Sequence, residues 1–210
     1  QLGHKMARSV VIATPAEFTP LQKEFTAQVI ERAGYGVTAT LDEPTAAAMA
    51  YGLHREKNIN YVLVYDWGGG TLDIALLWIK NGNVQLLNTD GDRDFGGANI
   101  DQCLFDLLRA KFPPNDRKCP PHVLLSIAEE TKIKLSKHDK ANVRCGRSIY
   151  TVYRKDFEKH CETVLDRAMF SMERLLDESK VKNRDIDAVV LVGGSTRIPS
   201  LRSRLTAFFD

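Results

Sequence analysis

The sequence predicts a mixed α/β fold, and three observations support this. Continuous apolar runs of the kind found in buried strands occur at 10–13, 61–65 and 188–192. Segments with apolar residues at helical spacing lie between these runs. The second and third runs lead into glycine-rich loops, and such strand ends are where open α/β sheets bind their ligands.

The N-terminal elements show how each boundary is assigned. The strand at 10–13 is expected to end at Thr14-Pro15, because proline has no N–H to donate to a neighbouring strand. Thr19 and Gln22 have the spacing of a capping box, Pro20 stands at the first helical position, and Gly34 is a plausible end of that helix. One apolar helical face follows at i, i+4 and i+8: Leu21, Phe25 and Val29.

The remaining elements follow from the same periodicities, with glycine and proline as breaks. In chain order we expect a strand at 37–41, a helix at 45–51, a strand at 61–65, a turn at 66–70, strands at 71–79 and 84–88, a loop at 91–97, helices at 100–112 and 123–135, weak strands around Val143 and Tyr150, one long helix at 155–179, a strand at 188–192, a loop at 193–196 and a helix from about Pro199. Asn81-Gly82 predicts a two-residue hairpin turn. Pro113-Pro114 and Pro120-Pro121 bracket a polar loop, the best candidate for a subdomain junction.

Composition and charge narrow the class of protein. The chain has 210 residues, 43% of them hydrophobic and 27% charged, which is ordinary globular composition for one large domain or two small ones. No apolar run approaches the roughly 20 residues of a membrane span, and residues 1–10 show no signal peptide. The 29 basic and 27 acidic residues nearly balance, and a net charge of +2 is too small for nucleic acid to be the main partner. We therefore expect neither a membrane nor a nucleic acid as partner.

The four cysteines are the chain's only thiols, at positions 103, 119, 145 and 161. They form no CxxC pair and no tight spacing of metal ligands. From this pattern we expect buried or scattered free thiols and a reducing compartment, in preference to a disulfide framework or a structural zinc site.

The loop at 66–70 places three glycines between two strands. Glycines let backbone N–H groups approach an anion without obstruction by a Cβ atom, which makes a nest for phosphate. Asp66 stands at the strand end, and period-two alternation puts Thr71 and Asp73 on one face of the next strand. Hard oxygen ligands of this kind suit a Mg²⁺-nucleotide, and no Walker A lysine follows the glycines. The alternative is a simple glycine-rich turn with solvated aspartates.

A second loop, at 193–197, repeats the arrangement of an apolar strand, two glycines, hydroxyl residues and a helix. Helix N-termini favour anions, and Arg197 is suited to stacking on a base. Taken alone, this loop is equally well a helix-capping turn, but two such loops together favour nucleotide binding. Glu43, at a strand-to-helix junction, would reach a hydrated metal or stay solvated. Glu129, Lys132 and Ser136 share one helix face, which by spacing alone is a solvated face.

At three places the residues match one family. The strings DEPTAAA at 42–48, DWGGGTLD at 66–73 and LVGGSTRIP at 191–199 resemble, in order and spacing, signatures of the Hsp70 nucleotide-binding domain. The resemblance runs nearly end to end, and sugar kinases, actin and bacterial actin-like filaments share the fold without these strings. It implies an actin-like ATPase (ribonuclease H-like) fold. The expected divisions are 1–56 as the end of the first lobe, 57–112 with 180–210 as the inner subdomain of the second lobe, and 113–179 as its outer subdomain.

The resemblance also implies ligands and roles. ATP or ADP, Mg²⁺ and K⁺ ions would occupy an interlobe cleft. Asp66, Thr71 and Glu43 are the expected catalytic residues, and Asp66, Glu43 and Asp73 the metal residues, mostly through water. The expected nucleotide contacts come from the two glycine loops and one helix: Gly68, Gly69, Gly70, Thr71, Glu129, Lys132, Ser136, Gly193, Gly194, Ser195, Thr196 and Arg197.

Five residues depart from the family pattern. The family usually has asparagine at Asp42, a smaller residue at Trp67, acidic residues at Ala98 and Asn99, and an interdomain arginine at Lys23. The changes at Ala98 and Asn99 put ribose or lobe-closure contacts in question. Lysine lacks the bidentate fork of arginine, so coupling to a substrate domain would weaken.

Several parts of the family pattern are not found in the 210 residues. These are the first phosphate loop, the catalytic lysine of the first lobe, the final strands, the hydrophobic linker and the peptide-binding domain. In this ATPase class both lobes clamp the phosphates. We therefore expect the chain to be mainly the second lobe with the tail of the first, and to hydrolyse ATP very poorly alone.

The resemblance implies an ATP-binding segment of an Hsp70-type chaperone, whose nucleotide state controls protein-substrate binding in the parent protein. Its partners would be unfolded polypeptide clients through a further domain, together with J-domain and nucleotide-exchange co-chaperones, and its default location would be cytoplasmic. The alternative is a divergent, non-hydrolysing Hsp70-like scaffold or co-chaperone. A sugar or small-molecule kinase on the same fold is a third reading, which the chaperone-like strings disfavour.

Overall fold

The computed structural model describes residues 9–112 and 118–210 and divides into two compact units. The first unit comprises the described part of 1–64 together with 75–89 and 187–190. The second unit comprises the described parts of 65–74, 90–186 and 191–210. The proline-bracketed loop expected as a subdomain junction lies largely outside the described residues. No helix in the described ranges has the length and apolar character needed to cross a membrane.

The first unit begins with a βαβ arrangement. Strand β1 (Ser9–Thr14) pairs in parallel with β2 (Gly36–Asp42), and helix α1 (Pro20–Arg32) makes the crossover that a parallel pair requires. The predicted capping box is confirmed, since the Gln22 backbone N–H donates to Thr19 Oγ1 (3.3 Å) and the Thr19 N–H to Gln22 Oε1 (2.8 Å). Helix α2 (Glu43–Ala50) and a 3-10 turn, η1 (Leu53–Arg55), follow directly.

Four strands form the largest sheet, in the order β5-β4-β3-β8. They are β3 (Tyr61–Trp67), β4 (Leu72–Lys80), β5 (Asn83–Asp92) and β8 (Ala188–Val192). Consecutive residues are buried along the middle of β3 and β4, as their continuous apolar runs predict for strands covered on both faces. The two-residue turn between β4 and β5 is also confirmed, because Asn81 and Gly82 both have positive φ (52° and 79°).

Two strand ends were predicted wrongly. Strand β3 continues through Asp66 and Trp67, which the sequence assigned to a turn, and β5 continues through Gly91 to Asp92, which it assigned to a loop. The glycine at 91 has a packing reason, because a Cβ atom there would overlap the backbone carbonyl of Leu72 in β4. Gly91 therefore permits close approach of two backbones and does not end the strand.

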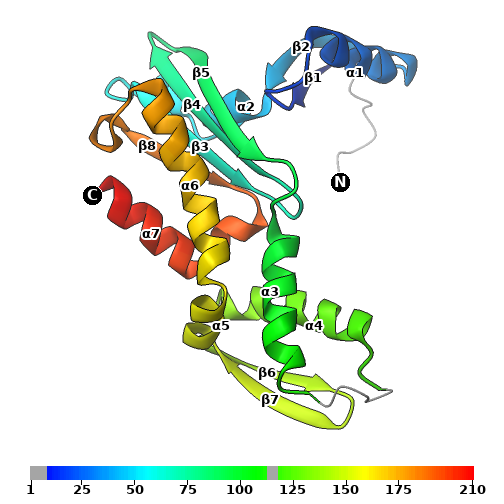
Figure 1. Ribbon diagram of the computed structural model, residues 1–210. Coiled ribbons are helices and arrows are strands. Elements are labelled where there is room, and N and C mark those ends of the chain that lie inside the picture. The colour runs from blue at the N-terminus through cyan, green and yellow to red at the C-terminus, as the bar shows by residue number, and fades with distance from the viewer. Residues whose placement is uncertain (1–8, 113–117) are drawn as a thin grey trace. The chain divides into compact units, whose positions relative to one another are not determined.

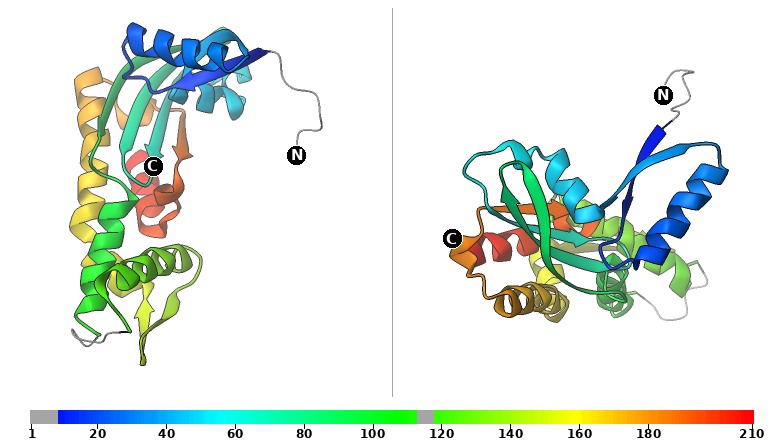
Figure 2. Two further views of the ribbon diagram at one scale, coloured as in Figure 1. Left: turned by 90° about the vertical axis from the view of Figure 1, so that its right-hand side faces the viewer. Right: turned by 90° about the horizontal axis from the view of Figure 1, so that it is seen from above.

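The second unit contains most of the helices. Helix α3 (Gly97–Arg109) packs against α4 (Pro121–Leu135), and α4 in turn packs against the antiparallel hairpin of β6 (Lys140–Cys145) and β7 (Ser148–Tyr153) (Figures 1 and 2). Turn η2 (Asn183–Asp185), turn η3 (Gly194–Arg197) and helix α7 (Pro199–Phe209) complete the chain. Helix α3 begins three residues before its predicted start, because the glycine pair at 96–97 opens the helix.

The single long helix expected at 155–179 is wrong. The structure has α5 (Arg154–His160) and α6 (Glu162–Ser179), with a break at Cys161, whose φ and ψ are −97° and 17°. Tyr65 of β3 is hydrogen-bonded to α6, since its buried hydroxyl donates to the Ala168 carbonyl (2.7 Å). Burial of this phenol in an apolar environment raises the pKa of Tyr65 well above its usual range.

The prediction of free thiols is also wrong. Cys103 on α3 is bonded to Cys161 between α5 and α6, and Cys119 is bonded to Cys145 at the end of β6. The Cα atoms of the two pairs are 5.9 and 5.2 Å apart, within the usual range for disulfides. The paired cysteines are 58 and 26 residues apart in sequence, so neither pairing could be recognised from spacing. The partners come together only when the helices and the hairpin pack.

Candidate functional site

The glycine-rich turn between β3 and β4 is closed by its own backbone. The Gly68 N–H donates to the Thr71 carbonyl (3.0 Å), and the Thr71 hydroxyl donates to Asp73 Oδ2 (2.8 Å). Gly69 and Gly70 are exposed, and a Cβ atom built on either would meet no atom of another segment within 4 Å. The alternation predicted for Thr71 and Asp73 is confirmed, since both are exposed while Leu72 between them is buried. The turn thus leaves open space over two glycines.

A second glycine pair, Gly96-Gly97, lies against this turn. The N–H groups of Gly97 and Ala98, at the start of α3, donate to the carbonyls of Gly68 (2.9 Å) and Gly69 (2.8 Å). A Cβ atom on Gly96 would stand 2.5 Å from backbone atoms of Gly69 and Gly70, so only glycine fits there. The carbonyls of the β3–β4 turn therefore cap the N-terminus of α3.

The third loop, after β8, packs on the other side of β3. Gly193 has a φ of +84°, and a Cβ atom on it would overlap the Trp67 backbone and approach Asp66 Oδ1 at 2.7 Å. The buried hydroxyl of Ser195 donates to the Gly68 carbonyl (2.9 Å), and that of Thr196 donates to the Gly193 carbonyl (2.8 Å). These two hydroxyls fix the loop, while Gly194 is exposed and open.

Helix α4 contributes a lysine to the same place. Lys132 Nζ lies 2.8 Å from Asp101 Oδ1 on α3 and 3.2 Å from the Gly97 carbonyl, with 13% of each charged side chain exposed. The Ser136 hydroxyl, one turn on, donates to the Lys132 carbonyl (3.0 Å). Glu129 is exposed one turn earlier. The expected helix face therefore carries the nearly buried Lys132 between the exposed Glu129 and the half-buried Ser136.

The three loops and the lysine converge at Gly97. A Cβ atom there would meet Ser195 Oγ at 2.8 Å, Lys132 Nζ at 3.1 Å and the Gly68 carbonyl at 3.4 Å. One point of the second unit is thus surrounded by a hydroxyl, an ammonium group and a backbone carbonyl from three separate segments. Glycine is the only residue that leaves these groups in place.

Two carboxylates of the site, Asp66 and Asp101, are destabilised in their charged forms. Burial, and then the nearby charge of Asp73, raise the pKa of Asp66 above its usual value. Burial also raises the pKa of Asp101, against the opposing effect of Lys132. A cation between Asp66 and Asp73 would relieve the repulsion between them.

A metal ion here would have few protein ligands. Among the described residues no group of three or more His, Cys, Asp or Glu side chains is arranged to hold a metal. Magnesium fits such a site, because it is usually bound by one or two carboxylates together with water and substrate phosphates. Asp66 and Asp73 are the two carboxylates that such a site would use.

The structure brings together most, but not all, of the expected site residues. Residues of the two predicted loops and Lys132 lie in one unit and meet around Gly68 and Gly97. Arg197 is exposed at the end of η3. Glu43 belongs to the other unit, where it begins α2.

Sequence reasoning missed three residues of the site: Gly96, Gly97 and Asp101. The adjacent glycines directly before an amphipathic helix were a signal for the first two. Asp101 had no such signal, because its partner lies 31 residues away on another helix. Asn99, a departure from the family pattern, accepts a hydrogen bond from the Gly96 N–H (2.8 Å), as an aspartate would.

Comparison with known proteins identifies the family. The family model described as Hsp70 protein matches residues 1–210. The chain is 38% identical to the chaperone protein HscA of Proteus mirabilis over 95% of its length, and 36% identical to the HscA homolog of Actinobacillus pleuropneumoniae over its whole length. It is 36% identical to the chaperone protein dnaK of Cyanophora paradoxa over 95% of its length. The chain belongs to the Hsp70 family.

Family membership confirms the resemblance drawn from the three signature strings. The α/β architecture is consistent with the actin-like ATPase fold of Hsp70 proteins. The chain spans about a third of the length of these relatives, 33% to 35%.

Proposed function

We propose that this Hsp70 chain binds the Mg²⁺ complex of ATP or ADP at the glycine loops of its second unit. The observation that carries the proposal is the convergence of three glycine loops and Lys132 at Gly97, beside open space over Gly69 and Gly70. Exposed glycine backbone that no side chain obstructs suits phosphate oxygens, and Lys132 would help to hold the loops in place through its contacts with Asp101 and the Gly97 carbonyl. Bound nucleotide would control protein-substrate binding in the parent protein.

The nucleotide would be divided among the segments. Gly69, Gly70 and Thr71 hold the phosphates, since all three are exposed and a Cβ atom on either glycine would meet no neighbour. Exposed Arg197 and Glu129 contact the adenosine from η3 and α4. The hydroxyls of Ser195 and Thr196 act by shaping the loop, because both are already bonded to backbone carbonyls.

The metal would be held by the two carboxylates of β3 and β4. When bound, Mg²⁺ neutralises charge on the phosphates. Asp66 would hold the metal through water and position the hydrolytic water, and Asp73 accepts the hydrogen bond of the Thr71 hydroxyl. By the family resemblance, Glu43 would be a further carboxylate for the metal's water ligands, and K⁺ a further cation.

The lobe arrangement, partners and location of the parent protein are further parts of this proposal. We assign 1–56 to the first lobe, 57–112 with 180–210 to the inner subdomain of the second lobe and 113–179 to its outer subdomain. Unfolded polypeptides, J-domain proteins and nucleotide-exchange factors are the partners, in the cytoplasm. Hydrolysis by the 210 residues alone is very slow, because positioning from both lobes sets the rate in this class of ATPase.

Calorimetric titration with Mg-ADP and Mg-ATP tests the proposal. Gly70→Val places a side chain in the open space and weakens binding at least about tenfold, while folding is retained because its Cβ atom meets no neighbour. Thr71→Val removes the hydroxyl and weakens binding several-fold. Thr151→Val, which removes a similar side-chain hydrogen bond in the β6–β7 hairpin, serves as control and leaves binding unchanged.

Two results would oppose the proposal. Unchanged affinity in both site variants would show that the nucleotide does not bind at the assigned site. Absence of any nucleotide binding by the wild-type chain would rule out the proposed function. Nucleotide binding without turnover, measured in the parent protein, would instead indicate a non-hydrolysing Hsp70-like scaffold.

A further inference from the structure

We propose that Arg167 is a positioning residue for the nucleotide site, acting through a stack of Arg167, Phe95 and Trp67 behind the glycine loops. The inference rests on the proposed function, because it concerns the same site. All three residues lie in the second unit. None of them was among the predicted site residues, although Trp67 was recognised as larger than the usual family residue.

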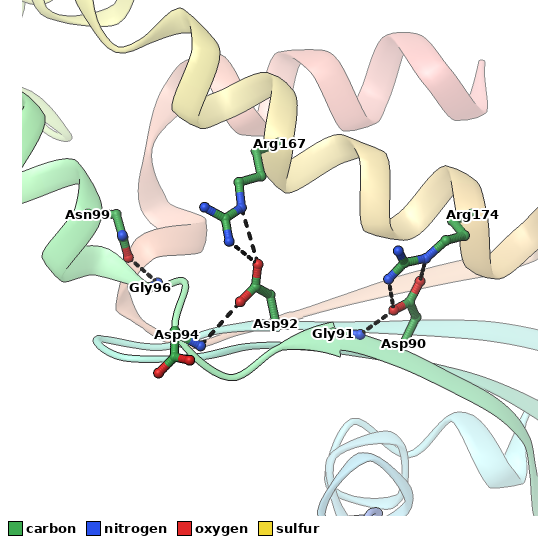
Figure 3. A network of polar contacts seen from close by, with 8 residues as sticks. All are labelled: Asp90, Gly91, Asp92, Asp94, Gly96, Asn99, Arg167 and Arg174. Atoms are coloured by element: carbon green, nitrogen blue, oxygen red, sulfur yellow. Dashed lines mark hydrogen bonds and ion pairs between the residues drawn. The ribbon is translucent and has the colours of Figure 1, made fainter.

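Arg167 is held in place by Asp92. From α6, its Nε donates to Asp92 Oδ2 at 3.1 Å, and Nη2 donates to the same oxygen (Figure 3). The other carboxylate oxygen accepts the Asp94 N–H (3.2 Å), so one aspartate joins the helix to the segment leading to Gly96. This pairing holds the pKa of Asp92 below its usual value. The guanidinium group is therefore fixed relative to the end of β5.

The same guanidinium group stacks on an aromatic pair. Its central carbon lies 4.4 Å from the centroid of the Phe95 ring, within the range of a cation–π interaction. Phe95 in turn stacks on Trp67, with ring centroids 5.5 Å apart and an interplanar angle of 25°. Both aromatic side chains are almost fully buried. Trp67 Nε1 has no hydrogen-bond partner in the described part of the chain, so packing sets the position of the indole.

Each aromatic residue directly precedes a glycine of the site. Trp67 is followed by Gly68, and its backbone contacts Gly193, whereas Phe95 is followed by Gly96. Glycines have no side chains to hold them in place, so their neighbours determine where their backbone lies. A shift of Phe95 or Trp67 therefore moves the groups that surround Gly97.

The chain contains a matched control for this role. Arg174, two turns further along α6, makes the equivalent ion pair with Asp90 of β5, through Nε (2.6 Å) and Nη2 (2.5 Å) (Figure 3). The aromatic ring under Arg174 is Phe170 of its own helix, at 5.7 Å. Arg174 thus fastens the same helix to the same strand without contacting the Phe95–Trp67 pair. Loss of helix docking and loss of the stack can therefore be separated.

The experiment compares Arg167→Met with Arg174→Met in the full chain. Three quantities are measured: the dissociation constant for Mg-ADP by calorimetry, the melting temperature, and the fluorescence of Trp67 in a Trp78→Phe background. We expect similar falls in melting temperature for the two variants. Only Arg167→Met should weaken Mg-ADP binding, by about fivefold or more, and shift the Trp67 emission to longer wavelength. Arg174→Met should leave the affinity within about twofold of wild type.

A double variant tests whether Arg167 acts through Phe95. Arg167→Met combined with Phe95→Leu should weaken binding no more than Phe95→Leu alone, because the stack is already lost. The inference is overturned if wild type binds Mg-ADP while the two arginine variants bind it equally well, or if the Arg167 and Phe95 effects simply add. Absence of binding by wild type would overturn the proposed function itself, and the inference with it.

Discussion

Lys23 Nζ lies 2.5 Å from Asp42 Oδ1, so two residues that depart from the Hsp70 pattern pair with each other. The family usually has arginine and asparagine at these positions, a pair with one charge, whereas this chain has an ion pair. The contact joins α1 to the last residue of β2, directly before Glu43 and α2. The two changes, which the sequence presents separately, therefore affect residues that contact each other.

The Lys23–Asp42 pair should show measurable coupling. The two side chains are 28% and 24% exposed, so we expect Lys23→Met and Asp42→Asn to destabilise the fold by up to about 1 kcal/mol each. The double variant should lose less than the sum, and the coupling should shrink in high salt. Urea denaturation of all four proteins at two salt concentrations measures this, and strictly additive losses would contradict it.

Gly96→Ala should be among the most damaging single-methyl changes in the chain. The added Cβ atom would lie 2.5 Å from backbone atoms of Gly69 and Gly70, which cannot rotate away. We expect a loss of about 2 kcal/mol or more, measured by urea denaturation. Gly70→Ala, whose Cβ atom meets no neighbour, is the control and should change stability little. Equal losses in the two variants would mean that the glycine loops are not in contact.

Asp66→Asn should stabilise the fold while it weakens the site. Burial and Asp73 raise the pKa of Asp66, so the ionised carboxylate is unfavourable in the native state. Removal of that charge should raise stability near pH 7, by less than removal of a fully buried charge would, because the half-buried carboxylate is partly screened by solvent. The native state binds the Asp66 proton more tightly than the unfolded chain does, so the advantage should shrink as the pH falls through the folded-state pKa.

Thermal unfolding of wild type and Asp66→Asn between pH 4 and pH 8 provides the measurement. Asp94→Asn, which makes the same change at an exposed aspartate, is the control. A stabilisation independent of pH would show that the charge of Asp66 is not its origin.

Lys132→Met should be costly because it leaves Asp101 without its partner. The pair is 13% exposed on each side, so we expect a loss of about 2 kcal/mol. Burial and the charge of Glu129 would then act unopposed to raise the pKa of Asp101, so the loss should diminish as the pH is lowered.

Lys134 supplies the control for this prediction. Its ion pair with Glu130 is well exposed, so Lys134→Met should cost less than about 0.5 kcal/mol. A second variant, Lys132→Met with Asp101→Leu, should recover much of the lost stability. Failure of that recovery would show that the lysine's contact with the Gly97 carbonyl, and not the ion pair, is what matters.

The disulfides can be tested directly by thiol counting. The unfolded protein without reductant should react with no equivalent of a thiol reagent, because both pairs are bonded. Cys103→Ser with Cys161→Ser should lower the free energy of unfolding by about 2–4 kcal/mol relative to the oxidised protein. Four reactive thiols in the unfolded, unreduced protein would contradict the pairing.

Local sequence signals were sufficient for most of the elements. The Thr19 capping box, the Asn81-Gly82 turn and the buried runs of β3 and β4 act over a few residues, so they could be recognised without the tertiary structure. Predictions failed where a distant segment overrides the local pattern. The sequence predicts a loop at Gly91, whereas in the structure Gly91 continues β5 and packs closely on β4. The sequence predicts helix at Cys161, whereas in the structure the helix breaks there.

The candidate site shows the same division. Glycine loops next to strands can be recognised from residue types alone, because few other residues allow close backbone approach. Asp101, Phe95 and Arg167 could not be found in this way, since each acts through a partner at least 28 residues away in sequence.

By itself the sequence determined the α/β class, the Hsp70 relationship and the two glycine loops that bear its signatures. These depend on short strings whose backbone and side-chain requirements are local. Only the tertiary structure decided that the Gly96-Gly97 pair contacts these two loops, that Lys132 pairs with Asp101, and that the cysteines form disulfides. Such contacts depend on which segments pack together, and the residue pattern within one segment does not indicate which other segment it will contact.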